Sequence, residues 1–196
     1  MNTSVKAHAV SQAATGISGL DDILAGGLTR DRLFLFEGSP GTGKTTAALS
    51  FLIAGAAAGE RSLYITLSET EAELRDSAAS HGWTLEGIQV FALAPPVRLL
   101  AAQQQQSLLY SSDLELGETT RLILKAVEEA QPHRVVIDSL SEIRLLAQGS
   151  LRYRRQVLAL KHYFARHGTT VLLLDDMTAE RHDMTVQSGA HGVGRR

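Results

Sequence analysis

The chain has 196 residues, of which 44% are hydrophobic and 20% are charged, and its formal net charge is −2. This size and composition are typical of one globular domain, and the chain lacks the basic excess that proteins binding nucleic acid through phosphate contacts usually show. The absence of cysteine excludes disulfides, thiolate metal sites and thiol nucleophiles.

Residues 1–14 are small and polar, and we expect them to form a flexible N-terminus ahead of one domain at 15–196. They contain no apolar block typical of a signal peptide. The chain also has no apolar run of about 18 residues, the length needed to span a membrane. We therefore expect a cytoplasmic protein that contacts neither membrane nor nucleic acid.

Short apolar runs alternate with stretches of helical periodicity along the domain. In chain order, the predicted elements are strand 32–36, helix 44–58, strand 62–67, helix 69–81, strand 89–93, helix 118–130, strand 134–137, helix 151–167 and strand 169–174. This alternation predicts an α/β fold, with a mainly parallel sheet covered by helices on both faces. The glutamine run at 103–106 is interpreted as an exposed surface segment rather than a site.

A phosphate-binding motif connects the first predicted strand to the first predicted helix. Residues 38–45 (GSPGTGKT) match the P-loop pattern G-x-x-x-x-G-K-[ST], in which glycines let backbone N–H groups surround an anion at a helix N-terminus. Lys44 is expected to reach the β- and γ-phosphates of ATP, and the Thr45 hydroxyl to ligate Mg²⁺. The predicted nucleotide-binding residues are Gly38, Ser39, Pro40, Gly41, Thr42, Gly43, Lys44, Thr45 and Thr46. The alternative is a glycine-rich turn before an exposed helix that carries a lysine at its start.

An aspartate is expected to complete the metal site. Residues 135–137 (VVI) predict a buried strand, and Asp138 follows at its carboxyl end, where ligands bind in open α/β sheets. We expect Asp138 to hold Mg²⁺ through a water molecule, as a Walker B aspartate does, together with Thr45. Alternatively, Asp138 caps a helix that begins near Ser139.

Glu69, just after the second predicted strand, is the candidate for orienting or deprotonating the attacking water. The pattern Ser68-x-x-Glu71 could instead be a capping box, which would make Glu69 an acidic residue of the first helical turn. Asp175 and Asp176 follow the last predicted strand. Either one could sense the γ-phosphate through water, or both could lie in a solvated turn.

Other residues have two interpretations each. Trp83 is expected to pack under the sheet edge, with stacking on a base as the alternative. The arginines at 152–155 are expected on a solvated helix face, with a contact to another subunit or to nucleic acid as the alternative. Thr185 and Ser188 are interpreted as ordinary loop residues.

Several segments carry a family resemblance in a fixed order: TGISGLDDILAGGL at 15–28, EGSPGTGKTT at 37–46, LYITLSETEAEL at 63–74, ASHGW at 79–83, VVIDSLSEIRLL at 135–146 and RYRRQVLALKHYFARHGTTVLLLDD at 152–176. They resemble the KaiC-like branch of the RecA superfamily of ATPases. The resemblance implies a RecA-like P-loop fold, hydrolysis of Mg·ATP and assembly into a hexameric ring with nucleotide between subunits. It assigns a catalytic role to Glu69 alongside Lys44, and it implies a place in signalling or regulation with a signalling-protein partner.

The sequence departs from this family in two places. Family members commonly have two adjacent glutamates after the second strand, whereas this chain has Ser68 followed by Glu69, which suggests slower hydrolysis. In the family, further strands follow the fifth, and a Lys or Arg from that region of a neighbouring subunit reaches the γ-phosphate. We expect this chain to lack those last strands, and Arg195 and Arg196 come too early for that role. Serine/threonine autokinase activity belongs to the second domain of KaiC, and no acceptor is assigned here.

Two alternatives to a slow ATPase stay open at this point. A nucleotide-binding module that signals by occupancy is favoured by the single glutamate and the absent Lys or Arg. A DNA-dependent ATPase of RadA or RecA type would predict basic DNA-binding loops, and the net charge gives it no support.

Overall fold

The computed structural model describes residues 11–93, 108–176 and 192–195, with side chains described for 11–93 and 115–176. The strands are β1 (Gln12–Ala13), β2 (Leu28–Thr29), β3 (Leu33–Gly38), β4 (Ser62–Thr66), β5 (Ile88–Ala92), β6 (Arg134–Asp138), β7 (Thr170–Asp176) and β8 (Gly192–Arg195). The helices are α1 (Ser18–Ile23), α2 (Lys44–Ala57), α3 (Glu71–Ser80), α5 (Leu108–Ala130), α6 (Leu140–Ala147) and α7 (Ser150–His167). Among these described segments, no helix combines the length and apolar character that a membrane span requires. The glutamine run, Thr185 and Ser188 lie outside the described residues.

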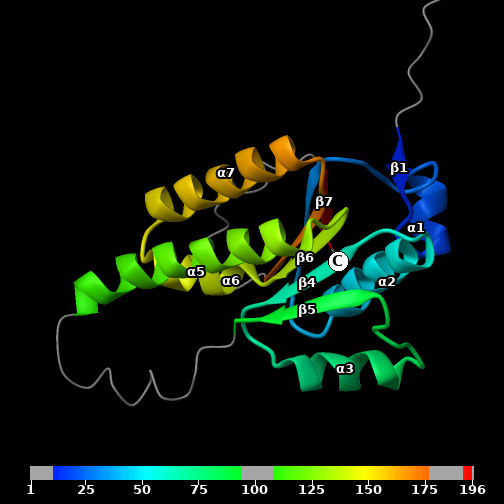
Figure 1. Cartoon of the computed structure of the whole chain (residues 1–196), viewed down its shortest axis with the longest axis horizontal. Coiled ribbons are helices and arrows are strands. Elements are labelled where there is room, and N and C mark those ends of the chain that lie inside the picture. The colour runs from blue at the N-terminus through cyan, green and yellow to red at the C-terminus, as the bar shows by residue number, and fades with distance from the viewer. Residues whose placement is uncertain (1–10, 94–107, 177–191, 196) are drawn as a thin grey trace, which may run out of the picture.

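The main sheet has six strands in the order β5-β4-β6-β7-β3-β8, and every neighbouring pair is parallel. Parallel strands need crossover connections, and helices provide these on both faces of the sheet (Figure 1). The predicted α/β fold, a RecA-like parallel sheet with helices on both faces, is confirmed. A separate two-stranded antiparallel sheet, β1 with β2, lies near the N-terminus.

The sheet extends beyond the predicted strands. Residues 192–195, where we expected the chain to end without a further strand, form β8 and pair with residues 34–37 of β3. The sequence does not predict β8, because its GVGR segment alternates glycine with other residues and has no apolar run. The fuller expectation, that the domain lacks the last strands of its family, stays a prediction.

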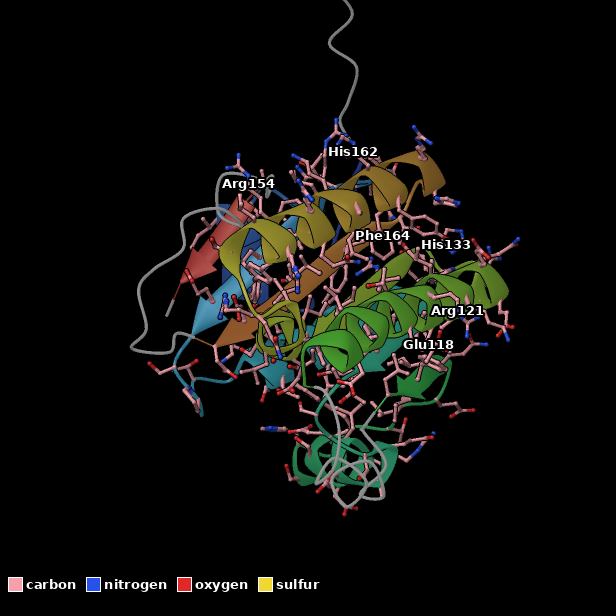
Figure 2. The ribbon with its side chains drawn as sticks, turned by 90° about the vertical axis from the view of Figure 1, so that its left-hand side faces the viewer. Glu118, Arg121, His133, Arg154, His162 and Phe164 are labelled. Carbon is pink, nitrogen blue, oxygen red and sulfur yellow. The ribbon has the colours of Figure 1, made fainter. Side chains whose placement is uncertain are left out.

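Helices α5, α6 and α7 cover one face of the sheet, and α2 and α3 cover the other (Figure 1). The sheet has one hydrophobic core on each face. Successive strand residues point to opposite faces, so each central strand contributes to both cores, and its sequence is a continuous apolar run. On α7 the predicted inward positions Val157, Leu160 and Phe164 are all buried. Figure 2 shows Phe164 directed from α7 toward the sheet, with Arg154 and His162 on the outer side of the helix.

Two helices differ from their predictions. Helix α5 begins at Leu108 rather than at 118, because the polar residues and Gly117 weaken the periodicity of its first part. Its predicted inward residues Ile123 and Val127 are buried. Helix α6 is absent from the predicted elements, since it has only 8 residues and begins almost directly after β6.

A buried arginine joins the sheet to α2 and to the N-terminal segment. Arg134, at the start of β6, is 1% exposed. Its guanidinium donates to the Glu60 carboxylate at 2.7 Å and to the carbonyl oxygens of Ala14 and Phe51 at 2.5 and 2.8 Å. Arg30 also pairs with Glu60, at 2.5 Å. Burial alone would raise the pKa of Glu60, but the hydrogen bonds and charges of the two arginines outweigh it and lower the pKa from 4.5 to about 2.

The substitution Glu60→Gln should lower the free energy of unfolding at neutral pH by about 2 to 3 kcal/mol, because it leaves the buried guanidinium without its countercharge. Since the pKa of Glu60 is lower in the folded state, its contribution is complete above pH 4.5 and is lost as the pH falls toward about 2. Urea unfolding at a series of pH values measures both effects, and the variant should lose less stability than the wild type over that range. Glu118→Gln, which removes one partner of the exposed pair with Arg121 (Figure 2), is the control and should change little. Equal effects of the two substitutions would contradict this account.

Candidate functional site

The carboxyl ends of four neighbouring strands bring the predicted site residues together. Strands β4, β6, β7 and β3 lie side by side in that order. Glu69 follows β4, whereas Asp138 ends β6, Asp176 ends β7 and Gly38 ends β3. The register aligns Gly38 with Asp176, and Thr66 of β4 with Asp138. Residues far apart in the sequence therefore meet at the edge of the sheet where α/β proteins bind ligands.

The P-loop lies between β3 and α2, as the sequence predicts. Gly41 and Gly43 have φ angles of +79° and +84°, a left-handed backbone conformation that a side chain would disfavour. Thr42 closes the turn, because its backbone N–H and its hydroxyl both donate to the carbonyl oxygen of Ser39, at 3.3 and 2.8 Å. Gly43 is the N-cap of α2 and offers no capping side chain. The first N–H groups of the helix are thus left for an anion.

Lys44 lies over this loop. Its ammonium donates to the carbonyl oxygens of Gly38 and Ser39 at 2.9 and 3.0 Å and forms an ion pair with Asp176 at 2.8 Å. The Lys44 side chain is only 12% exposed. This placement, together with the buried face of α2, rules out the alternative of a lysine at the start of an exposed helix.

Asp138 is held by two hydroxyl groups. Its Oδ2 accepts a hydrogen bond from the Tyr64 hydroxyl at 2.6 Å and one from the Thr45 hydroxyl at 3.3 Å. Burial raises the pKa of Asp138, and the two hydrogen bonds oppose that rise. The N-cap of α6 is Ser139. The alternative interpretation of Asp138 as a helix cap is therefore wrong.

Thr45 and Asp138 fit a magnesium site. They supply the hydroxyl and carboxylate oxygens that Mg²⁺ prefers, and Mg²⁺ usually completes its octahedral shell with water and substrate phosphates. Within the described part of the chain, no group of three or more His, Asp or Glu side chains could hold a metal on its own. The residues present thus suit a metal that arrives together with phosphate.

Glu69 lies in the loop before α3 rather than in its first turn. The capping box at this helix is formed by Thr70 and Glu73, so the predicted box at Ser68 and Glu71 is wrong. The Thr66 hydroxyl fixes the backbone of Glu69, accepting from its N–H at 2.9 Å and donating to its carbonyl at 3.0 Å. Burial raises the pKa of Glu69, and the negative charges of Asp138 and Glu73 raise it further.

The two aspartates at the end of β7 have different surroundings. Asp175 is 1% exposed and forms an ion pair with Arg144, and it accepts a hydrogen bond from the Ser141 hydroxyl at 3.0 Å. Burial raises its pKa, and Arg144 opposes the rise. Asp176 faces the P-loop through its pair with Lys44. The interpretation of both residues as a solvated turn is wrong, since both belong to β7, and Asp176 is the one beside the P-loop.

Two residues that the sequence did not single out also lie at this site. Tyr64 contacts Asp138, as described above. The ring of His81 lies with its Nε2 3.4 Å from the Thr46 hydroxyl, and its centre is 5.0 Å from that of Trp83. Trp83 is partly buried against the core on the α2 face. Both residues fall within segments that carry the family resemblance, but their contacts with Asp138 and Thr46 join parts of the chain that are far apart in the sequence.

Comparisons with known proteins show which family the sequence resembles. The family model of the KaiC ATPase matches residues 13–193. UPF0273 proteins of Methanopyrus kandleri and Pyrococcus furiosus are both 28% identical to this chain, over 94% of its length and 75% and 76% of theirs. The circadian clock protein KaiC3 of Synechocystis is 30% identical over 94% of this chain, which spans 35% of that relative. Because the family model covers nearly the whole chain, the chain belongs to the KaiC ATPase family, a group of ATP-binding domains of the RecA superfamily.

Proposed function

We propose that the chain binds Mg·ATP and hydrolyses it slowly, as a KaiC-type ATPase with a role in signalling or regulation. One observation carries this proposal: the side chains of Lys44, Thr45 and Asp138 converge at the P-loop. Lys44 lies within 3.0 Å of two loop carbonyls, and the Thr45 hydroxyl lies 3.3 Å from the Asp138 carboxylate.

The loop would hold the phosphates through its backbone. In this proposal the N–H groups of 41–45 surround the β-phosphate at the positive end of α2. Lys44 would exchange the Gly38 and Ser39 carbonyls and the Asp176 carboxylate for β- and γ-phosphate oxygens. Asp176 would then stand close to the γ-phosphate, so its charge opposes binding unless the Lys44 ammonium and the metal neutralise the phosphates.

Bound Mg²⁺ would neutralise charge on the β- and γ-phosphates, and Thr45 and Asp138 would hold it. The Thr45 hydroxyl can use its oxygen for the metal while its proton still points to Asp138. Asp138 would hold the metal through a water molecule, using the carboxylate oxygen that the two hydroxyls leave free.

Glu69 would orient the water that attacks the γ-phosphorus. Its side chain makes no hydrogen bond or ion pair with another described residue, so its carboxylate is available to water. The raised pKa makes it a stronger base than an ordinary glutamate. Because Ser68 stands where relatives commonly have another glutamate, we expect slow turnover.

A ring of several copies would complete the site. Among the described residues, no Lys or Arg besides Lys44 forms an ion pair with Asp138 or Asp176. In the ring that the family implies, a neighbouring subunit would supply a second cation at the γ-phosphate, which in phosphoryl transfer can raise the rate by about 10³-fold or more. A signalling-protein partner and a cytoplasmic location stay predictions.

The test is phosphate release from ATP by the purified chain, measured with Mg²⁺ and again after its removal by EDTA. We expect release that depends on Mg²⁺ and falls to the rate of a protein-free blank in EDTA. The reason is that Thr45 and Asp138 carry no positive charge themselves, so the Mg²⁺ they would hold is what neutralises the phosphates there. Release that is equal in EDTA would contradict the proposed mechanism. Mg·ATP binding without any release would instead support the occupancy module, which the serine at position 68 favours.

A further inference from the structure

We propose that Tyr64 is a positioning residue of the magnesium site, acting through Asp138. The inference rests on the proposed function and adds a residue to its metal site. Tyr64 lies on β4 and is fully buried, and its hydroxyl donates to Asp138 Oδ2 at 2.6 Å. This is shorter than the 3.3 Å bond from Thr45 to the same oxygen.

The sheet register explains why a tyrosine reaches this point. Tyr64 lies opposite Val136 on β6, and Thr66 lies opposite Asp138. Tyr64 and Val136 belong to the same core, on the α2 face of the sheet, and Asp138 follows Val136 by two residues and so points to that face as well. The long phenol therefore extends along the sheet from inside the core to the carboxylate at its edge.

The hydroxyl is not needed for packing. The ring of Tyr64 lies in an apolar core whose other members include Phe34, Leu49 and Leu172. A phenylalanine would fill the same space without burying a polar group, and burying a hydroxyl costs free energy unless it is hydrogen-bonded. The Tyr64 hydroxyl donates to Asp138 and also lies within hydrogen-bonding reach of Thr45, so its polar atom contacts both residues proposed for the metal site.

The consequence is a fixed carboxylate. With Oδ2 accepting from both Tyr64 and Thr45, the Asp138 side chain cannot rotate freely. Oδ1 accepts no hydrogen bond from the described residues and is left for the waters of the metal. Groups that orient metal-binding side chains in this way typically change metal affinity by about 10- to 100-fold when they are removed.

The experiment compares Tyr64→Phe with the wild type in calorimetric titrations of a non-hydrolysable ATP analogue, at a series of Mg²⁺ concentrations and in EDTA. We expect the Mg²⁺ concentration for half-maximal binding to rise about 10-fold, and the affinity in EDTA to stay unchanged. Tyr163→Phe, on the far side of the sheet in α7, removes the same group and should leave both quantities unchanged. The melting temperature of each free variant reports any loss of folding separately.

A double-mutant cycle with Asp138→Asn tests the route of the effect. If Tyr64 acts through the Asp138 carboxylate, Tyr64→Phe should cause little further change in the Mg²⁺ dependence when residue 138 is asparagine. Identical Mg²⁺ curves for the wild type and Tyr64→Phe, or a full shift in the Asp138→Asn background, would overturn the proposal. A wild-type protein that shows no Mg²⁺-dependent binding at all would overturn the proposed function itself, and the two failures are distinguishable because the second requires no variant.

Discussion

Replacing Lys44 with alanine is expected to weaken Mg·ATP binding by about 30-fold or more, since removing one partner of a buried charge pair typically costs about 2 to 5 kcal/mol. The loss has two sources at this site. The ammonium that would contact the β- and γ-phosphates is gone, and the carboxylate of Asp176, now 2.8 Å from Lys44 Nζ, is left facing the phosphates without a cation between them. The rise in melting temperature on adding saturating Mg·ATP should be largely lost in the variant.

Lys125→Ala is the matched control for this prediction. Lys125 is exposed on α5 and, among the residues that the structure describes, makes a long pair with Glu129, at 3.7 Å, so its removal should leave nucleotide binding as it is. A thermal shift that survives in Lys44→Ala at the wild-type size would show that the P-loop lysine does not bind the nucleotide.

The variant Glu69→Gln is expected to bind Mg·ATP as tightly as the wild type and to hydrolyse it about 100-fold more slowly. General acid–base groups contribute about 10²- to 10⁴-fold, and a slow enzyme is expected at the lower end of that range. Glutamine keeps the size of the side chain but cannot accept a proton. Single-turnover phosphate release, measured beside calorimetric binding, separates the two steps.

Glu71→Gln tests the specificity of that effect. Glu71 lies two residues further on, in the first turn of α3, and pairs with Arg75 on the helix surface. The same chemical change there should leave the rate within about twofold, since exposed pairs contribute little. Equal rates in the wild type and Glu69→Gln would leave Glu69 without a catalytic role and favour the occupancy module.

The fold was predictable where local pattern and tertiary burial agree. The strand predicted at 134–137 corresponds to β6, because a parallel strand buried on both faces is a continuous apolar run. The order of the strands was not predicted, since it depends on pairing between segments far apart in the chain. Strand β8 has almost no apolar content, so only its pairing with β3 defines it.

The site was predictable to the extent that its residues form local motifs. The P-loop is read from one contiguous segment at 38–45, and its backbone has the strand–loop–helix geometry that the motif requires. The helix start near Glu69 was ambiguous, because Ser68-x-x-Glu71 and Thr70-x-x-Glu73 both match a capping box and only the folded chain selects the second. The contact of Tyr64 with Asp138 could not be predicted from the sequence, because 74 residues separate the two.

The central claim is that backbone amides around Gly41 and Gly43 hold a triphosphate whose metal is shared by Thr45 and Asp138. Calorimetric titration of ATP into the folded wild-type chain, with Mg²⁺ and then with EDTA, tests it most directly. We predict saturable binding at one site per chain with Mg²⁺ and clearly weaker binding in EDTA. The absence of any binding heat at several temperatures, from protein shown to be folded by circular dichroism, would contradict the account.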